Sequence, residues 1–421
     1  MIIWLVTIGE PIPHPNNNLR LHRTGLLAKY ISENSSHELI WWTSDFNHFT
    51  KTHIFKKDYT FEVNKNYKLV VLHGCGYKKN ISINRIVDHK QISKKFITLS
   101  NNERKPDIII TSFPTLDLTI ASIKLGKLYN VPVLIDYRDM WPEVFVNLVP
   151  LFFKQITKLI LYPLFYKTSK VFAKSSGIIS ITNNFLKIAL KKINRNISVN
   201  DASFPLAYLK NQFSNKELEE SIVFWNNYNI KHVDLQIAFV GTIGYQFDLE
   251  TIIDAVSILN QQGIHNFQIF LCGTGDKLNH LVQKSINNNN VIFPGYINAA
   301  QINSLLSQVD IGLCPYNINE AFMSSIPGKA IEYFSAGLPI LTTLKEGELG
   351  KLLIANNIGF FYTYKDPYSL ASIIKELIIN KNGLNKCKEK VLNLFQSNYE
   401  ANIIYKNYLS HIEKVVINNE R

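Results

Sequence analysis

The strongest constraint on the fold is an alternation of short apolar segments with longer amphipathic segments, which occurs twice along the chain. The expected strands cover residues 1–8, 39–43, 67–72, 107–112, 131–137 and 177–182 in the first series, and residues 236–240, 267–272, 291–293, 311–314, 340–343 and 359–362 in the second. Strands that alternate with helices at this spacing form βαβ units and parallel sheets. The sequence therefore predicts an α/β protein with two doubly wound, Rossmann-like domains that face an interdomain cleft.

The length of the chain also favours two domains, because 421 residues exceed the size at which a single hydrophobic core usually stops growing. We place the first domain at residues 1–212 and the second at residues 213–399. A C-terminal helix of about residues 400–421 is expected to pack back on the first domain. The other expected helices cover residues 20–33, 81–98, 115–129, 148–175, 214–228, 248–262 and 299–307, and Pro163 should kink or split the fourth of them.

Positive charge is concentrated in the first half of the chain. Residues 1–200 hold 28 Lys and Arg against 13 Asp and Glu, whereas residues 201–421 hold 17 against 20. This asymmetry indicates that the first half faces something anionic: a membrane surface, a phosphorylated acceptor or nucleic acid. Nucleic acid is disfavoured, because the sequence shows neither a recognisable recognition helix for a DNA groove nor a series of exposed aromatic residues for base stacking.

One basic segment has an amphipathic pattern. In residues 148–175 lysines are interspersed among apolar residues, and Lys167, Lys170 and Lys174 fall on one helix face. Such a helix can lie on an anionic membrane surface, although a helix packed on the sheet with solvated lysines is slightly preferred. No apolar run is long enough to span a bilayer, the opening residues lack the basic lead of a signal peptide, and the four cysteines are widely separated. We expect a cytoplasmic protein that can also be peripheral on the inner face of the cytoplasmic membrane.

Residues 323–339 read as a loop, a helix of about three turns and a sharp stop. Ser324 or Ser325 is expected to cap the helix, Pro327 suits its first position, and Gly337 can end it in the left-handed conformation. The unpaired N–H groups and the dipole at a helix start attract phosphate. This segment is therefore a candidate anion site.

Lys329 and Glu332 lie three residues apart in this helix and share one face. That face can offer a cation to a phosphate and a carboxylate to sugar hydroxyls; the alternative is a structural helix with a surface ion pair. A dinucleotide fingerprint is only weakly supported, because Leu278 stands where the third glycine after Gly273 and Gly275 is required. No metal-binding or nucleophile motif is recognisable, so we expect no metal and no cofactor beyond a nucleotide-sugar substrate.

Five blocks of residues occur in an order that is typical of one enzyme family. They are Leu19–Gly25, Trp41–His48, Asp136–Glu143, Phe239–Gly244, and Pro327–Lys329 leading to Glu332. Through these blocks the chain resembles, over nearly its full length, the family-4 retaining glycosyltransferases of the GT-B fold. Within that family it is similar to the bacterial enzymes of O-antigen and capsule biosynthesis, including L-fucosamine-type transferases. The resemblance implies a nucleotide sugar bound on the second domain, an acceptor on the first, and transfer without a metal.

The resemblance also implies a nucleotide-sugar site. It comprises Gly244, Gly273, Gly275, Ile297, Ser324, Ser325, Ile326, Pro327, Lys329 and Glu332. Glu332 matches the family's ribose-binding carboxylate, whereas Ser324 replaces a second glutamate, which puts a sugar-hydroxyl contact in doubt. The backbone of residues 325–327 matches the segment that contacts the diphosphate and the sugar.

A second departure from the family concerns positive charge. The family often carries an Arg and a Lys after the first strand of the second domain, but residues 242–249 contain no cation. We hypothesise that Lys329 supplies this charge together with the helix start. Lys329→Ala should then lower turnover by more than tenfold, which corresponds to at least ~1.4 kcal/mol of barrier.

In the first domain, the end of the expected strand at residues 131–137 carries the candidate acceptor groups. Asp139, and after it Asp136, is expected to orient the acceptor hydroxyl. Arg20, Arg23 and Arg138 are candidates for contacting an anionic acceptor such as a lipid-linked diphosphate. The alternatives are that one of the two aspartates pairs with Arg138 to hold the loop, and that the other arginines are ordinary surface residues.

The sequence thus predicts a retaining glycosyltransferase that moves a hexose or an acetamidosugar to a lipid-linked saccharide in surface polysaccharide biosynthesis. Two alternatives share the fold: a non-hydrolysing sugar-nucleotide epimerase and a non-catalytic partner subunit.

Overall fold

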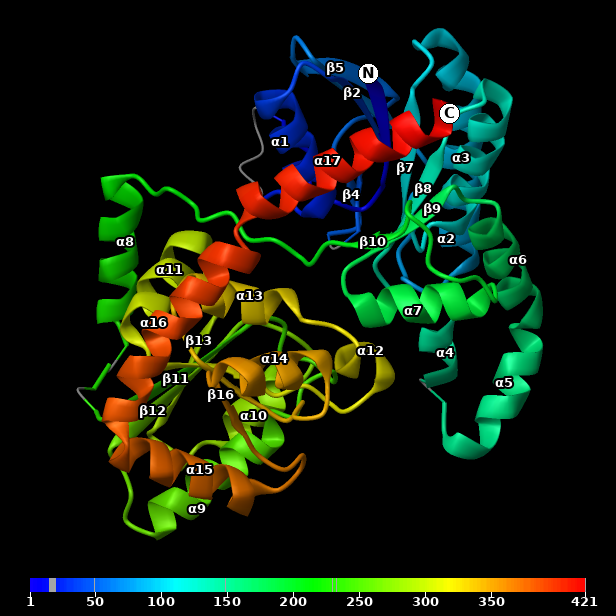
Figure 1. The fold of residues 1–421 in the computed structure, drawn as a ribbon. Helices are drawn as coiled ribbons and strands as arrows, with labels where there is room; N and C mark the ends of the chain where they lie inside the picture. The colour runs from blue at the N-terminus through cyan, green and yellow to red at the C-terminus, as the bar shows by residue number, and fades with distance from the viewer. Residues whose placement is uncertain (15–19, 49, 148, 229, 232, 421) are drawn as a thin grey trace. The chain divides into compact units, whose positions relative to one another are not determined.

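The computed structural model describes residues 1–14, 20–48, 50–147, 149–228, 230–231 and 233–420. It divides into two compact units (Figure 1). Unit 1 comprises Met1–Pro205 and the segment from Ala401 on, and unit 2 comprises Leu206–Glu400. Each unit contains one large, mainly parallel sheet flanked by helices. The prediction of two Rossmann-like α/β domains is confirmed.

The sheet of unit 1 has the strand order β10-β9-β8-β7-β1-β2-β6-β5. Its strands are β1 (Ile2–Val6), β2 (Glu38–Ser44), β5 (Tyr59–Asn64), β6 (Tyr67–Leu72), β7 (Ile108–Phe113), β8 (Val133–Tyr137), β9 (Gly177–Ser180) and β10 (Ala202–Ser203). Only the edge pair β5–β6 is antiparallel. The central strands are almost continuously apolar because helices cover both faces of a parallel sheet.

The helices of unit 1 surround this sheet. They are α1 (Arg23–Asn34), α2 (Ile83–Leu99), α3 (Leu116–Tyr129), α4 (Glu143–Asn147), α5 (Lys154–Ile160), α6 (Tyr162–Ala173), α7 (Asn183–Lys192) and α17 (Ala401–Glu420). The core between α2, α3 and the sheet is built on edge-to-face aromatic contacts, with ring centroids 5.3 Å apart for Trp4–Trp42 and 5.0 Å apart for Trp42–Phe96. Such pairs stabilise a core beyond the area that they bury.

Helix α17 completes unit 1 although it lies about two hundred residues beyond the rest of that unit in the sequence. It packs against α1, and its side chains Tyr405, Tyr408, Ile412 and Val415 are at most 1% exposed. The Phe204 ring stacks on Tyr408, with 4.6 Å between the centroids. This helix is therefore part of the unit 1 core.

The sheet of unit 2 has the order β13-β12-β11-β14-β15-β16, entirely parallel. Its strands are β11 (Leu235–Val240), β12 (Phe267–Cys272), β13 (Val291–Gly295), β14 (Ile311–Cys314), β15 (Ile340–Thr342) and β16 (Gly359–Phe361). Counted within the unit this is the order 3-2-1-4-5-6, whose reversal between β11 and β14 creates a crevice where such sheets bind ligands.

The helices of unit 2 alternate with its strands. They are α8 (Asn215–Asn226), α9 (Glu250–Gln261), α10 (Leu278–Lys284), α11 (Ala299–Gln308), α12 (Glu320–Met323), α13 (Gly328–Ser335), α14 (Glu348–Asn356), α15 (Pro367–Ile379) and α16 (Lys381–Asn398). Helix α11 begins with a capping box between Asn298 and Gln301, which satisfies two otherwise unpaired amides.

Two local predictions have opposite outcomes. Pro163 does split the long basic segment, because α5 ends at Ile160 and α6 starts at Tyr162. The capping of α13 by Ser324 or Ser325 is wrong. The helix begins one turn later, at Gly328, after Pro327 as an N-cap without a side-chain bond, and Ser324 instead ends α12. Gly337 has the expected positive φ, +74°. In the described ranges, no helix is long and apolar enough to cross a membrane.

Candidate functional site

The crevice of unit 2 is bordered by glycine loops at the carboxyl ends of its strands. Gly241 follows β11, and the segment Gly273–Gly275 follows β12. A Cβ on Gly273 would collide with the carbonyl oxygen of Gly241, and one on Gly275 with that of Ile243. The two loops also exchange backbone bonds, such as Ile243 N to Thr274 O at 2.9 Å. These glycines are thus explained by loop-to-loop packing, which shapes the crevice floor.

Helix α13 starts at this crevice without a side-chain cap. Pro327 precedes it as the N-cap, with φ −64° and ψ 144°, and a proline side chain cannot accept a hydrogen bond from the first amides. Ser324 and Ser325 are buried, with 4% and 9% of their surface exposed. An uncapped helix start leaves amide donors and a positive dipole end for an anion. The structure thus makes the start of α13 a better anion site than the predicted serine cap would.

Lys329 is the candidate side chain that the fold positions most distinctly. Its Nζ lies 4.2 Å from the centroid of the Phe239 ring and 5.4 Å from that of Phe247. A Cβ on Gly241 would collide with this Nζ, so the ammonium lies directly against the first loop. Across the described part of the chain, Lys329 forms no ion pair. It is a cation supported by aromatic faces, and among the described residues no carboxylate forms a salt bridge with it, although Glu332 interacts with it electrostatically.

Burial lowers the pKa of Lys329 to about 8, although Cys314, Glu332 and Cys272 pull it upward. The lysine is therefore mostly charged at neutral pH, at an energetic cost to the fold. Glu332 follows one turn later and is partly exposed. Ile297 is 4% exposed beside Tyr296, which is 76% exposed. Glu332 and Ile297 thus remain candidates for the nucleotide-sugar site by their position alone. Lys329 is also distinguished by its burial and its lowered pKa.

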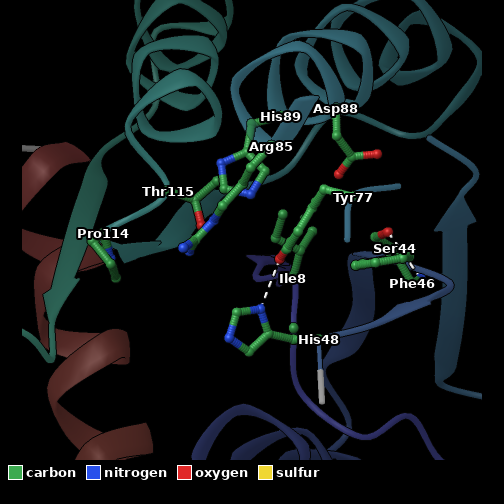
Figure 2. A pocket seen from close by; sticks show the side chains of 11 residues that line it. Ile8, Ser44, Phe46, His48, Tyr77, Arg85, Asp88, His89, Pro114 and Thr115 are labelled. Atoms are coloured by element: carbon green, nitrogen blue, oxygen red, sulfur yellow. Dashed lines mark hydrogen bonds between the residues drawn. The ribbon is translucent and has the colours of Figure 1, made fainter. Parts of the chain in front are cut away.

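Unit 1 has a pocket at the corresponding place in its own sheet (Figure 2). There β1 lies between β7 and β2, and the pocket is lined by residues that follow or end these strands, among them Gly9, Ser44 and Pro114. Its volume is about 160 Å³. The remaining lining residues are Ile8, Phe46, His48, Tyr77, Arg85, Asp88, His89 and Thr115. His48 ends one of the five blocks of the family resemblance, whereas Arg85 and His89 belong to none of them.

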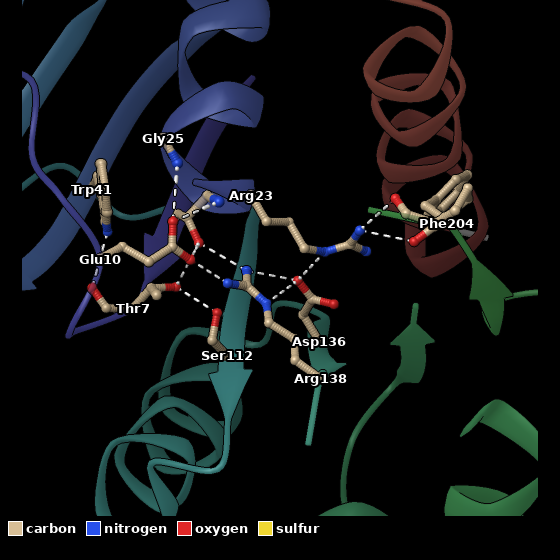
Figure 3. Close-up of polar contacts among 11 residues, drawn as sticks. Thr7, Glu10, Arg23, Gly25, Trp41, Ser112, Asp136, Arg138 and Phe204 are labelled. Atoms are coloured by element: carbon tan, nitrogen blue, oxygen red, sulfur yellow. Dashed lines mark hydrogen bonds and ion pairs between the residues drawn. The ribbon is translucent and has the colours of Figure 1, made fainter. Parts of the chain in front are cut away.

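Three of the residues proposed to contact the acceptor, Arg23, Asp136 and Arg138, form a largely buried ion network instead of an open surface (Figure 3). The carboxylate of Asp136 pairs with Arg23 Nε at 3.0 Å and with Arg138 Nη2 at 2.7 Å. Arg138 also pairs with Glu10, and Glu10 accepts from Thr24 N at 2.9 Å at the start of α1. The side chains of Arg23 and Asp136 are only 4% and 1% exposed. For Asp136, the structure favours the pairing alternative.

The charges of this network stabilise one another, as is typical of an ion cluster that holds a fold together. Burial raises the pKa of Asp136, but Arg138 and Arg23 outweigh this effect and lower it below the ordinary carboxyl value. Arg23 also donates through Nη1 to the carbonyls of Phe204 at 2.8 Å and Pro205 at 3.0 Å. The cluster thus ties α1, the end of β8 and the end of the first chain segment together. Glu10, its second carboxylate, was missed because it lies in a proline- and asparagine-rich loop without any motif.

Asp139 differs from Asp136 although only three residues separate them. It is exposed, and it accepts a backbone bond from Met140. Desolvation by the surrounding protein raises the pKa of Asp139, and Glu143 adds to this increase. The bond from Met140, Arg85 and Lys192 act in the opposite direction without cancelling it. A carboxylate with a raised pKa is a better proton acceptor. Arg20 is likewise exposed and precedes α1.

A group that can ligate a metal also emerges from the fold. Asp45, His53 and His73 bring their ligand atoms within 4.8 Å of one another. Each imidazole Nδ1 bonds to one oxygen of Asp45, His53 at 3.0 Å and His73 at 2.9 Å, and the carboxylate also accepts from Phe55 N. No motif in the sequence indicates this group, because the fold, and not the spacing along the chain, brings the three residues together. Their mutual bonds account for their positions.

Comparisons with known proteins agree with this architecture. A family model described as glycosyl transferases group 1 matches residues 223–393. A curated relative, an uncharacterized glycosyltransferase of Methanocaldococcus jannaschii, is 26% identical over 161 residues, which span 37% of this chain and 39% of that relative.

Two solved structures are similar over the whole chain. Sucrose-phosphate synthase of Thermosynechococcus elongatus has a TM-score of 0.72 at 13% identity and covers 99% of both chains. HepE of Anabaena, solved in complex with UDP-glucose, has a TM-score of 0.63 at 14% identity over 98% of this chain and 100% of that one. Most of the second unit therefore matches the model of the group 1 glycosyl transferases, and the whole chain has the GT-B fold.

Proposed function

We propose that the protein is a retaining glycosyltransferase that takes its sugar from a nucleotide-sugar donor bound in the crevice of unit 2. The observation that carries this proposal is the ammonium of Lys329, which lies against Gly241 without a salt bridge to any carboxylate among the described residues. It stands beside the uncapped start of α13. A buried cation needs an anion to offset its desolvation, and the diphosphate of a sugar nucleotide fits that need. The UDP-glucose complex of HepE supports this choice of donor class.

In this proposal the chemistry is electrostatic. Negative charge grows on the leaving diphosphate as the sugar–phosphate bond breaks, and preformed donors stabilise that charge. Lys329 and the first amides of α13 would act on the diphosphate. Glu332, on the same helix, would hold the ribose. On unit 1, exposed Asp139 would orient the acceptor hydroxyl, since Asp136 is committed to its two arginines.

The direct test is a thermal-shift and turnover screen against nucleoside diphosphates and sugar nucleotides. A ligand that binds only the native state raises the melting temperature with the logarithm of its concentration over Kd. We expect one base to stabilise the protein, and its sugar nucleotide to be consumed only when an acceptor is present. Conversion of the sugar nucleotide without an acceptor would identify an epimerase instead. Stabilisation by none of the panel would remove the proposed donor site.

The lowered pKa of Lys329 gives a pH prediction. In the free enzyme, Lys329 loses its proton as the pH rises through about 8. A bound diphosphate would raise the pKa of Lys329 and keep it protonated. Affinity for the nucleoside diphosphate should therefore fall about tenfold between pH 7 and pH 9. Titration calorimetry at both pH values measures this. The Lys329→Arg variant, which stays charged, should show a flat profile, and an equally flat profile in the wild type would contradict the assignment.

We also propose that the acceptor is lipid-linked and that unit 1 associates with an anionic membrane surface. Residues 151–166 comprise a short turn before α5, α5 itself and the start of α6, which lie at the edge of unit 1 (Figure 1), and they carry an exposed apolar patch. Its members are Leu151, Phe152, Phe153, Ile156, Leu159, Ile160, Tyr162 and Tyr166, each 47–81% exposed. Exposed Lys158, Lys167 and Lys170 lie in the same two helices. Apolar side chains with lysines around them suit a surface of anionic lipid.

Vesicle binding tests this patch. We expect sedimentation with vesicles that contain anionic phospholipid, and weak sedimentation with zwitterionic ones. Replacing Phe152 and Leu159 by serine removes about 1.5–3 kcal/mol of apolar transfer for each side chain and should weaken binding at least tenfold. The matched control replaces Ile222 and Val223 of α8, which are 56% and 64% exposed, and should bind normally. Equal binding by both double variants would refute the patch as the membrane contact.

A further inference from the structure

The pocket of unit 1 gathers positive charge in an unusual way (Figure 2). Arg85 projects from the first turn of α2, and its guanidinium lies 5.6 Å from the centroid of the Tyr77 ring. Lys51 lies 5.0 Å from the same centroid and bonds to the carbonyl of His48 and to Asn80. Arg85 Nη1 donates to the carbonyl of Asn80 at 2.9 Å. Two cations are thus held near one ring by neutral groups.

Arg85 has no carboxylate partner: no ion pair that the described residues form includes it. The acidic side chain of the pocket, Asp88, is 1% exposed and accepts from Gly76 N at 2.8 Å. In Figure 2 its carboxylate lies beyond Tyr77 from the Arg85 guanidinium. Asp139 interacts electrostatically with Arg85 but, within the part of the chain that the structure describes, forms no ion pair with it. Among the described residues, no acid therefore forms a salt bridge with Arg85 or Lys51, and an anionic ligand could still pair with them.

Two histidines complete the polar lining. His48 Nδ1 bonds to the hydroxyl of Tyr77 at 2.7 Å, and the His89 ring lies edge-on to the Tyr77 ring at 6.2 Å. Burial, followed by Lys51 and Arg85, lowers the pKa of His48 to about 4, and burial, followed by Arg85 and His48, lowers that of His89 to about 4. Both imidazoles are thus neutral at physiological pH and can form hydrogen bonds. The neighbouring cations, Arg85 and Lys51, disfavour a further positive charge in the pocket.

We infer that this pocket binds a phosphate group of the acceptor, with Arg85 as its main ligand, His48 and His89 in its lining, and Lys51 beside it against the Tyr77 ring. A guanidinium recognises phosphate through paired, charge-assisted bonds. The pocket lies at the strand-order reversal of its sheet, where α/β sheets bind ligands. Its volume of about 160 Å³ is below the ~300 Å³ at which sites for whole small molecules begin, so it suits a phosphate group with only part of the molecule attached.

This inference rests on the proposed function, since it assigns the pocket to the acceptor of that reaction. It also moves the anion-binding role from Arg23 and Arg138, which are held in the buried network, to Arg85. The lipid-linked acceptor proposed above would present the diphosphate of a lipid carrier, and a soluble sugar phosphate is the other source that the pocket could accept. The chemistry of recognition is the same for both.

The test measures phosphate binding with the donor site already occupied. Full-length protein is saturated with the nucleoside diphosphate that it binds, and inorganic pyrophosphate, a hexose 6-phosphate and a short-chain prenyl diphosphate in detergent micelles are then titrated by calorimetry. We expect the wild type to bind pyrophosphate and one of the two organic phosphates, which identifies the source. Arg85→Gln should weaken that binding at least tenfold.

The control is Arg104→Gln, which removes the same charge from a 69% exposed side chain paired with Glu38 on the surface, and it should change binding less than twofold. Nucleoside diphosphate binding should be unaffected in both variants. Equal phosphate binding by wild type and Arg85→Gln, or no binding of any of the three probes by wild type, overturns the pocket assignment but leaves the donor site in place. Failure of nucleotide binding itself would instead refute the proposed function.

Discussion

Replacing Lys329 by methionine should lower kcat/KM by about 100-fold or more while raising the melting temperature of unit 2. The loss follows because a preorganised cation at a developing negative charge contributes on the order of 2–4 kcal/mol to the barrier. The gain follows because burial lowers the pKa of Lys329 to about 8, so below that pH its charged form is favoured in the unfolded chain. Methionine fits between Phe239 and Phe247 without that cost. We expect roughly 1–3 kcal/mol of added stability, or a few degrees.

Turnover and thermal unfolding of the purified variant measure the two effects together. The matched control is Lys284→Met, which removes a surface lysine paired with Asp254 at 2.7 Å and should leave turnover within twofold. A stabilised variant with normal turnover would mean that the lysine is a packing residue. A destabilised variant would mean that its ammonium has a compensating partner in the folded protein.

The second large effect is expected at Asp136. Asp136→Asn leaves Arg23 and Arg138 buried beside a neutral amide, and breaking a buried ion pair from one side costs about 3–5 kcal/mol. Unfolding in denaturant, followed by tryptophan fluorescence, measures this cost, because Trp4, Trp41 and Trp42 report on the unit 1 core. Glu38→Gln, which breaks the exposed pair with Arg104, should cost less than about 1 kcal/mol.

Asp139→Asn provides the functional counterpart to Asp136→Asn. Since Asp139 is exposed, its replacement should leave the unfolding curve unchanged and lower kcat. If Asp136→Asn unfolds normally but loses turnover, the two roles are reversed, and Asp136 is then the group that acts on the acceptor.

Local patterns in the sequence were sufficient to predict most of the fold. The buried run at Ile108–Phe113 and the amphipathic segment at Leu116–Tyr129 are predicted within one or two residues, because strand and helix periodicities are local properties. The edge strand Tyr59–Asn64 was not predicted, since it is antiparallel and mostly exposed and so lacks an apolar run. Helix Asn183–Lys192 was also missed, although Thr182 caps it in a recognisable way.

The candidate site was predictable only where one segment carries it. Lys329 and Glu332 could be singled out because both lie in one short helix. The partners of Lys329 are two phenylalanines about ninety residues upstream, and Arg23 meets Asp136 across 113 residues. A single sequence gives no signal for such pairings, so a buried arginine there is indistinguishable from a surface one.

The position of α17 has a consequence for how the chain folds during synthesis. Unit 1 starts at the first residue, yet part of its core comes from Tyr405, Tyr408 and Ile412. A ribosome would therefore release a complete unit 2 while unit 1 still lacks one wall, which reverses the usual order in which the earlier domain matures first. Until residues 401–420 emerge, the Arg23 side of that unit stays open to water and to chaperones.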